Sequence, residues 1–592
     1  MLRLTELKLP LNHAPEALAP ALCTRLDIEP GELIGFTIHK RSHDARKKSA
    51  IVLIYQIDFQ LANEAAYLAR QQGDNKIIPS PDMRYKFVAQ APEGLTERPV
   101  VIGTGPCGLM AGLLLAQMGF KPIILERGKA VRERTQDTWG LWRRHTLNPE
   151  SNVQFGEGGA GTFSDGKLYS QIKDPQFLGR KVMEEFVKAG APEEILYVSK
   201  PHIGTFRLVK MVENMRATIT ALGGEIRFGS KVDRVLIDTH QVQGVELAGG
   251  ERIASRHIVL AIGHSARDTF QMLYDAGVYI EAKPFAIGFR VEHPQTLIDR
   301  ARFGLNAGNE VLGAADYKLV HHCKNGRAAY SFCMCPGGQV VAATSEAGRV
   351  VTNGMSQYSR AERNANSALV VNVDPEDFPE DFRKNPLAGI DFQRHWESQA
   401  FVAGGSDYCA PAQKVGDFIA GRPSTVLGSV QPSYQPGVRM TDLSSCAPDY
   451  VIEALREAIP AFDKQIQGFG LADALLTGVE TPHLLTHPHQ TRRRLAKPEH
   501  TRFVSRRRGR RLRRRHPVGG CGWHQGCGSR GTRNTAGSKS VTCLHPEPAA
   551  FRPVFGRGLL LILGHNTHPW SHRPSKVGTK GVDRGAVAIS CN

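Results

Sequence analysis

Hydrophobic and polar positions near the start of the chain follow two different periods. Strong alternation over residues 51–61 (IVLIYQIDFQL) predicts a half-buried strand, and residues 2–11 predict a second one. The remaining segments predict two helices and a charged turn, at residues 16–26, 63–71 and 42–48 respectively. These elements together indicate a small α/β module over residues 1–95.

Residues 100–128 (VVIGTGPCGLMAGLLLAQMGFKPIILERG) contain the most informative pattern in the chain. A β-branched run, an apolar helical stretch and a second apolar run predict strand, helix and strand over 99–102, 106–118 and 121–125. The turn after the first strand reads G-x-G-x-x-G, formed by Gly103, Gly105 and Gly108, and Glu126 ends the second strand.

Each residue of this unit has a physical task in binding a dinucleotide. Gly103 permits a tight turn, Gly105 lets a pyrophosphate approach the backbone, and Gly108 lets the helix pack against the strand. The N–H groups at the helix N-terminus then face the phosphates, and Glu126 can accept the hydroxyls of an adenosine ribose. The alternative is a βαβ crossover without a ligand, which the complete unit disfavours.

The rest of the chain predicts a change of structural class along its length. Residues 176–275 alternate between helix, including 207–222, and strand, residues 280–430 are rich in β patterns, and residues 448–478 return to helix. We therefore expect five segments: an N-terminal module, a dinucleotide-binding domain, a β-rich substrate domain, a return to the first domain, and a tail. Their expected ranges are 1–95, 96–278, 279–447, 448–481 and 482–592.

Two further stretches contain the glycines expected of a cofactor site. Residues 155–169 (FGEGGAGTFSDGKLY) would form a loop with many exposed N–H groups, able to wrap a large ligand. Residues 258–268 (IVLAIGHSARD) predict a buried strand whose Gly263 would let the chain pass close to the cofactor. The alternative for residues 155–169 is an ordinary surface loop, and the alternative for residues 258–268 is a further strand of the same sheet without a role in cofactor binding.

Several of these motifs, taken together, resemble one known family. They are the G-x-G-x-x-G unit, FGEGGAGTFSDGKL, AIGHSARDT, KPFAIGFRVEHP (283–294), YSFCMCPGG (330–338) and TNGMS (352–356). Over about residues 1–481 the chain looks like the uncharacterised bacterial FAD-dependent dehydrogenases or oxidoreductases of the glutathione-reductase-like FAD superfamily. The resemblance implies a glutathione-reductase-type, Rossmann-like FAD-binding α/β domain with an inserted β-rich substrate domain.

The same resemblance implies FAD as cofactor and oxidation or reduction of an unidentified small molecule by hydride transfer at the flavin. No second G-x-G-x-x-G occurs in a strand context, so electrons would come from the substrate or from NAD(P)H bound without a dedicated domain. The residues expected to bind FAD are Gly103, Gly105, Gly108, Glu126, Arg127, Gly158, Gly159, Thr162, Ser164, Asp165, Gly166, Lys167 and Gly263.

Candidates for catalysis are few. His264, Arg290, Glu292 and His293 could contact substrate or transfer protons, although a structural hydrogen bond or ion pair is an equal alternative for each. Cys333 and Cys335 form C-x-C and would point to the same side of a regular strand, either as a thiol pair near the flavin or as small packing residues. No C-x4-C follows the glycine unit, so a disulfide reductase of that type is not expected, and no metal site is predicted.

The net charge of +18 belongs almost entirely to the last fifth of the chain. From Thr481 onward there are 22 Lys and Arg against 3 Asp and Glu, and periodicity disappears. Back-translation of residues 506–517 (RRRGRRLRRRHP) with one choice of codons, read in a shifted frame, gives AGEGAGYAGGI, which resembles the FAD-closing segment of the family. We therefore expect a frameshifted C-terminus and a poorly structured tail.

An authentic tail is the competing interpretation. Its arginine runs would bind RNA, and Cys521, His524 and Cys527 could ligate zinc. The alternative functions are thus a flavoprotein acting on RNA and a non-catalytic remnant with little cofactor. Without a long apolar run or a signal-peptide pattern, we expect a cytoplasmic protein with reduced cysteines and no membrane partner.

Overall fold

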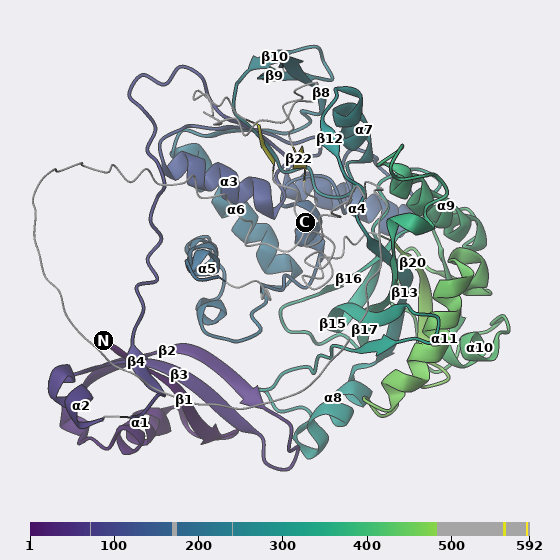
Figure 1. Ribbon diagram of the computed structural model, residues 1–592. Coiled ribbons are helices and arrows are strands. Elements are labelled where there is room, and N and C mark those ends of the chain that lie inside the picture. The colour runs from purple at the N-terminus through teal and green to yellow at the C-terminus, as the bar shows by residue number, and fades with distance from the viewer. Residues whose placement is uncertain (72, 169–173, 240, 482–560, 564–587, 590–592) are drawn as a thin grey trace, which may run out of the picture. The chain divides into compact units, whose positions relative to one another are not determined.

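The computed structural model describes residues 1–71, 73–168, 174–239, 241–481, 561–563 and 588–589. Three main groups of strands are visible: an N-terminal sheet, a sheet of short strands, and a large sheet of long strands (Figure 1). The expected frameshift and most of the tail lie outside the described residues. No helix within the described residues has both the length and the apolar character needed to cross a bilayer.

The N-terminal module is a four-stranded antiparallel sheet in the order β2-β3-β1-β4, with two helices. Leu22 and Leu26 of the first helix are fully buried with the apolar face of the sheet. The elements are β1 (Leu2–Pro10), α1 (Leu18–Leu26), β2 (Leu33–Asp44), β3 (Val52–Leu61), α2 (Glu64–Arg70) and β4 (Ile77–Pro79).

This module confirms the predicted strands and helices, with two corrections. The helix predicted from residue 16 begins as a 3-10 turn, Pro15–Ala17, and becomes an α-helix only at Leu18. The turn predicted over 42–48 starts later, because β2 continues to Asp44, where it still pairs with β3.

A parallel sheet forms the second group, in the order β11-β5-β6-β7. Its members are β5 (Val100–Ile102), β6 (Ile123–Leu125), β7 (Glu225–Arg227) and β11 (Ile258–Leu260), with β21 (Leu561–Leu563) antiparallel at the β11 edge. β5, β6 and β11 are short and consist of buried apolar residues, as strands covered on both faces require, whereas β7 has Glu225 and Arg227 and is only partly buried.

Different layers cover the two faces of this sheet. One face packs against α3 (Pro106–Gln117), α5 (Leu178–Lys188) and α6 (Thr205–Ala221). The other packs against α7 (Arg267–Asp275) and a small sheet of β8 (Val232–Asp238), β9 (Gln241–Leu247) and β10 (Arg252–Ala254). The helices predicted over 106–118 and 207–222 are confirmed as α3 and α6.

The third group is an eight-stranded sheet in the order β14-β15-β17-β13-β20-β18-β19, with β16 paired to β15. Its strands are β13 (Phe285–Pro294), β14 (Val320–His322), β15 (Ala328–Ala342), β16 (Thr352–Ser356), β17 (Asn364–Val373), β18 (Ala410–Lys414), β19 (Val438–Met440) and β20 (Leu475–Glu480). The other helices are α4 (Val131–Arg144), α8 (Gln295–Phe303), α9 (Ala388–Ala403), α10 (Val415–Ala420) and α11 (Asp449–Asp463), and β12 (Tyr279–Ile280) pairs with β22 (Ala588–Ile589).

Residues 448–478 correct the prediction of a purely helical return. The helical part is α11, which ends at Asp463, and β20 follows as a strand in the eight-stranded sheet, between β13 and β18. Every residue of β20 is buried, so its apolar run reflects burial on both faces rather than helical periodicity. The domain boundaries themselves stay predictions.

A buried ion pair joins two neighbouring strands of this sheet. Arg290 on β13 donates from Nε and Nη2 to the two Glu480 carboxylate oxygens on β20, at 2.6 and 2.8 Å. Its Nη1 donates to Asn366 Oδ1 at 2.6 Å, and neither charged side chain has exposed area. Burial alone would lower the pKa of Arg290, but the Glu480 carboxylate holds it above its usual value.

Replacing Arg290 should therefore destabilise the fold strongly. Arg290→Met leaves the Glu480 carboxylate buried without its cation, and we expect the free energy of unfolding to fall by about 3–5 kcal/mol. Urea unfolding followed by intrinsic fluorescence measures this change. Arg46→Met, which removes the exposed partner of Asp44, is the control and should leave the midpoint unchanged. Equal midpoints for both variants would show that the buried pair contributes little.

Candidate functional site

The turn between β5 and α3 brings backbone segments closer together than side chains permit. Gly103 has a φ of +103°, and a Cβ added there would lie 2.4 Å from the carbonyl oxygen of Ala261, just after β11. A Cβ on Gly108 would lie 1.9 Å from the Gly103 carbonyl oxygen. Gly103 thus permits the turn, and Gly108 permits close packing of α3, as the motif predicts.

Gly105 differs from these two glycines because nothing crowds it. Its φ is −64°, and the nearest atom to an added Cβ is Gly159 Cα at 3.9 Å. A side chain on Gly159 would be crowded, because its Cβ would lie 2.8 Å from Gly105 Cα. The second glycine-rich loop therefore passes directly over the N-terminus of α3, which leaves a cradle of bare backbone of the kind that phosphates occupy.

Glu126 lies at the end of β6 and is almost completely buried. One carboxylate oxygen accepts from the Thr104 N–H and hydroxyl at 2.9 and 2.7 Å, and the other accepts from the N–H groups of Gly128 and Gly156. The chain itself thus occupies the acceptor positions predicted for ribose hydroxyls. A ribose diol has to share these oxygens or displace the Thr104 hydroxyl.

One cavity of about 560 Å³ collects most of the predicted cofactor residues. Gly108 is the exception, since it lies beneath the turn rather than at its surface. The predicted residues that line the cavity are Gly103, Gly105, Glu126, Arg127, Gly158, Gly159, Thr162, Ser164, Asp165, Gly166, Lys167 and Gly263. The structure therefore brings together three segments that are far apart in sequence, and the FAD contacts of individual residues stay predictions.

Arg127 at the rim of this cavity is already engaged with the protein. Its guanidinium lies 4.2 Å from the centre of the Phe155 ring and forms ion pairs with Glu150 at 2.6 Å and Asp268 at 2.9 Å. Burial opposes its charge, but these two carboxylates keep the pKa of Arg127 above its usual value. Arg127 thus links the second glycine-rich loop to the start of α7.

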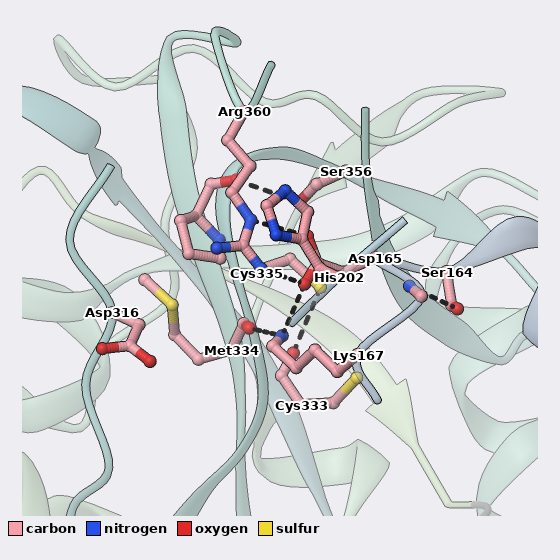
Figure 2. Close-up of polar contacts among 12 residues, drawn as sticks. Ser164, Asp165, Lys167, His202, Asp316, Cys333, Met334, Cys335, Ser356 and Arg360 are labelled. Carbon is pink, nitrogen blue, oxygen red and sulfur yellow. Dashed lines mark hydrogen bonds and ion pairs between the residues drawn. The ribbon is translucent and has the colours of Figure 1, made fainter. Parts of the chain in front are cut away.

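Lys167 and the buried Asp165 form a charged cluster (Figure 2), and both residues line the cavity. The Lys167 ammonium donates to the Met334 carbonyl of β15 and lies 3.4 Å from the Asp165 carboxylate. Arg360 forms a bidentate ion pair with the same carboxylate. Burial would raise the pKa of Asp165, but Lys167 and Arg360 lower it, so Asp165 remains ionised.

The candidates for catalysis separate into two groups. His264 and Cys333 line the cavity, whereas Arg290, Glu292, His293 and Cys335 do not. His293 Nε2 lies 2.7 Å from the Phe469 carbonyl oxygen, and burial lowers its pKa to about 4. Glu292 is buried, with hydrogen bonds from Asn364 and Ser433. These contacts are the structural alternatives named for His293 and Glu292.

Several cavity residues carried no site prediction. The segment before β14 contributes Asp316, Tyr317 and Lys318, β15 contributes Ser331, Phe332 and Met334, and β16 contributes Asn353. The motifs YSFCMCPGG and TNGMS contain some of these residues, and their presence among the family-like segments was the available signal. Arg360 had no such signal, because its role depends on a partner 195 positions away in sequence.

Comparison of the chain with known protein families identifies the class of protein that has this site. Residues 284–482, which contain all of β13–β20, match the family described as "FAD-dependent protein, C-terminal domain-like", and residues 1–60 match a domain of unknown function, DUF8436. The bare-backbone cradle at Gly105 and Gly159 fits the pyrophosphate of such a cofactor. The protein is thus an FAD-dependent protein, and FAD is its cofactor.

A bacterial relative shows which family this chain belongs to. An uncharacterised protein of Clostridium beijerinckii is 47% identical over 482 residues, which cover 81% of this chain and 89% of the relative. The chain belongs to the family of that clostridial protein.

Solved structures resemble the chain only distantly. The THI4 protein of Thermovibrio ammonificans matches with a TM-score of 0.22 and 17% identity, over 32% of this chain and 66% of that one. CtdE in complex with FAD matches with a TM-score of 0.25 and 11% identity, over 65% and 72%.

The openness around Gly105 leads to a test of cofactor contact. In Gly105→Ala the new methyl group fits the free protein but stands where a pyrophosphate would approach, so FAD affinity should fall about tenfold or more while stability stays unchanged. Titration of FAD fluorescence and urea unfolding measure the two quantities. Gly103→Ala is the matched control, because its clash with Ala261 should lower stability as well. Unchanged FAD affinity in Gly105→Ala would contradict this placement.

Proposed function

We propose that the protein is an FAD-dependent oxidoreductase that acts on a small molecule in the cavity. One observation carries this proposal: the glycine turn after β5 and residues 331–334 of β15 line the same cavity. That cavity therefore has both a dinucleotide cradle and a wall supplied by the eight-stranded sheet. FAD, when bound, supplies the acceptance and donation of hydride, and the chain supplies orientation and electrostatics.

The residues at the β15 side define what the chain can do there. The Lys167 ammonium is held against Met334 and stays charged, so it stabilises negative charge on a group that faces it. His264 lines the same cavity and is our candidate for proton transfer. The substrate is unidentified, and NAD(P)H is the proposed external electron source.

The layering of the parallel sheet supports the more specific fold proposal. Helices α3, α5 and α6 cover one face, and the sheet of β8, β9 and β10 covers the other. This order of layers is the one we propose as a glutathione-reductase-type FAD-binding domain. The eight-stranded sheet is then the substrate domain, and the cytoplasm is the proposed location.

We also retain the proposal that the sequence after Thr481 is out of frame. The family match ends at residue 482, which supports a change of reading frame close to that point. The alternative of RNA binding depends on the basic residues of 482–592, which lie outside the described residues apart from 561–563 and 588–589.

The oxidoreductase proposal predicts a flavin that its substrate can reduce. Protein purified with FAD should be yellow, and anaerobic addition of NADH, NADPH or a panel of small-molecule donors should bleach the flavin absorption with at least one of them. Gly105→Ala, prepared in parallel, should lack the colour at the same FAD concentration. Bound FAD that no donor in the panel reduces would contradict the proposed oxidoreductase activity.

The frame proposal predicts two measurable results. Resequencing of the gene around Thr481 should reveal a missing or additional base, and the protein expressed in the restored frame should hold FAD more tightly than the chain printed here. Equilibrium dialysis against FAD compares the two proteins. An uninterrupted gene together with an intact mass matching the printed chain would refute the proposal.

A further inference from the structure

The segment with Cys333 and Cys335 departs from regular strand geometry. Phe332 pairs with Ala368 and Cys335 pairs with Asn366, so β15 contains one residue more than β17 between these pairs. This excess is a bulge, and within it Cys333 has a φ of 44°, a left-handed value that residues other than glycine rarely adopt. Such conformations gather at functional sites, where the surroundings hold them.

The bulge brings the Cys335 thiol against the backbone of Cys333. The Cys335 thiol donates to the Cys333 carbonyl oxygen at 3.3 Å, and the two side chains interact electrostatically. They differ in accessibility: Cys333 lines the cavity, and Cys335 is fully buried behind it. A molecule in the cavity therefore meets Cys333 first.

Two cations lie near this pair of thiols, the partly buried Lys167 and the fully buried Arg290. The Lys167 ammonium is bound to the carbonyl of Met334, the residue between the cysteines, and it interacts electrostatically with both sulfurs (Figure 2). Arg290 donates to the Cys333 carbonyl at 3.3 Å and also interacts with both sulfurs. Positive charge stabilises a thiolate, which is the species that attacks disulfides.

The buried thiol keeps its proton more firmly than an ordinary cysteine. Its hydrogen bond to Cys333 and its burial hold the pKa of Cys335 well above the usual value. The thiol behind the cavity wall therefore stays protonated, and Cys333 is the thiol that a molecule in the cavity reaches. This asymmetry is the one expected of an attacking and a resolving cysteine.

We propose that Cys333 and Cys335 are a redox-active dithiol that reduces low-molecular-weight disulfides entering the cavity. The Cys333 thiolate attacks one sulfur of the small disulfide, which forms a mixed disulfide and releases a first thiolate. Cys335 gives its proton to that thiolate and attacks Cys333, which closes the Cys333–Cys335 disulfide and releases the second thiolate, protonated from water. In total, two protein thiols lose two electrons and two protons, and one small disulfide becomes two thiols.

This inference deepens the proposed function and rests on it at one point. The disulfide returns to the dithiol by gaining two electrons and two protons, and reduced FAD is the proposed donor. Cys333 and Cys335 on β15 of the eight-stranded sheet would then have the role that a C-x4-C pair after the glycine turn has in other disulfide-reducing flavoproteins. Formation of the disulfide itself does not depend on FAD.

The native chain offers a direct test, because trypsin releases both cysteines in one peptide, residues 328–349, which contains no other cysteine. We would incubate the full protein anaerobically in mixtures of reduced and oxidised glutathione and alkylate its free thiols. After digestion with trypsin, mass spectrometry measures the mass of this peptide. We expect a change from a doubly alkylated peptide to an unalkylated one that lacks two hydrogen atoms. A peptide that remains doubly alkylated in oxidised glutathione alone would overturn the proposal.

Single variants test the order of attack. Cys335→Ser should accumulate a mixed disulfide between Cys333 and glutathione, whereas Cys333→Ser should react at least about tenfold more slowly, because Cys335 is buried. Adding Lys167→Met to Cys335→Ser should slow mixed-disulfide formation, and Lys167→Arg should restore it. Cys23→Ser, in the N-terminal module, is the control and should oxidise at peptide 328–349 like the native chain. Equal rates for the two cysteine variants would refute the assigned roles.

The two proposals fail in different ways. A protein that forms the disulfide but remains colourless with FAD would contradict the oxidoreductase proposal while leaving the dithiol in place. A yellow protein whose peptide 328–349 never oxidises would contradict only the dithiol. If both hold, Cys335→Ser should consume two fewer electrons per bound flavin in an anaerobic dithionite titration.

Discussion

The whole site depends on a place where three backbone segments pass each other without side chains between them. Gly103, the start of α3 and the segment after β11 approach so closely that a single methyl group would meet a carbonyl oxygen. Because β5 and β11 are neighbouring parallel strands, this contact fixes where both strands end, and the cavity opens at that edge. The second glycine-rich loop then closes over Gly105, again through bare backbone. A site built in this way has little freedom to adapt, which suits a large cofactor of invariant shape.

The eight-stranded sheet reaches this cavity mainly through β15, and β16 adds Asn353. β15 is the longest strand of the sheet and pairs with β14, β16 and β17 along its length, so its backbone is held from several directions. The bulge at Cys333 interrupts that regular pairing where β15 meets the cavity, and a second shift of register follows between Cys335 and Gly338. Lys167 fastens the glycine-rich loop to the same place by bonding Met334. Cofactor cradle and sheet are thereby joined by a few buried polar contacts.

Much of the fold was readable from sequence because its strongest signals are local. The alternation at 51–61 and the unit at 100–128 each contain their own turn, period and termination, and both formed as predicted. β20 was missed because a strand buried on both faces has no period to distinguish it from a helix. Long-range pairing could not be predicted either. The sequence around Asp165 does not indicate that Arg360 is its partner. A C-x-C motif does not indicate a bulge, because the bulge depends on the register of β17 against β15.

The position of β20 has a consequence for how much of the chain this sheet requires. β20 is the last strand of the continuous described segment, yet it lies in the interior of the sheet, hydrogen-bonded to β13 on one side and β18 on the other. A chain interrupted after Thr481 would retain all eight strands and the continuous pairing from β14 to β19. An interruption only seven residues earlier would remove β20 and leave β13 and β18 with open edges, which are templates for aggregation. Cellular quality control would therefore treat two nearly identical truncations very differently, tolerating one as a folded protein and degrading the other.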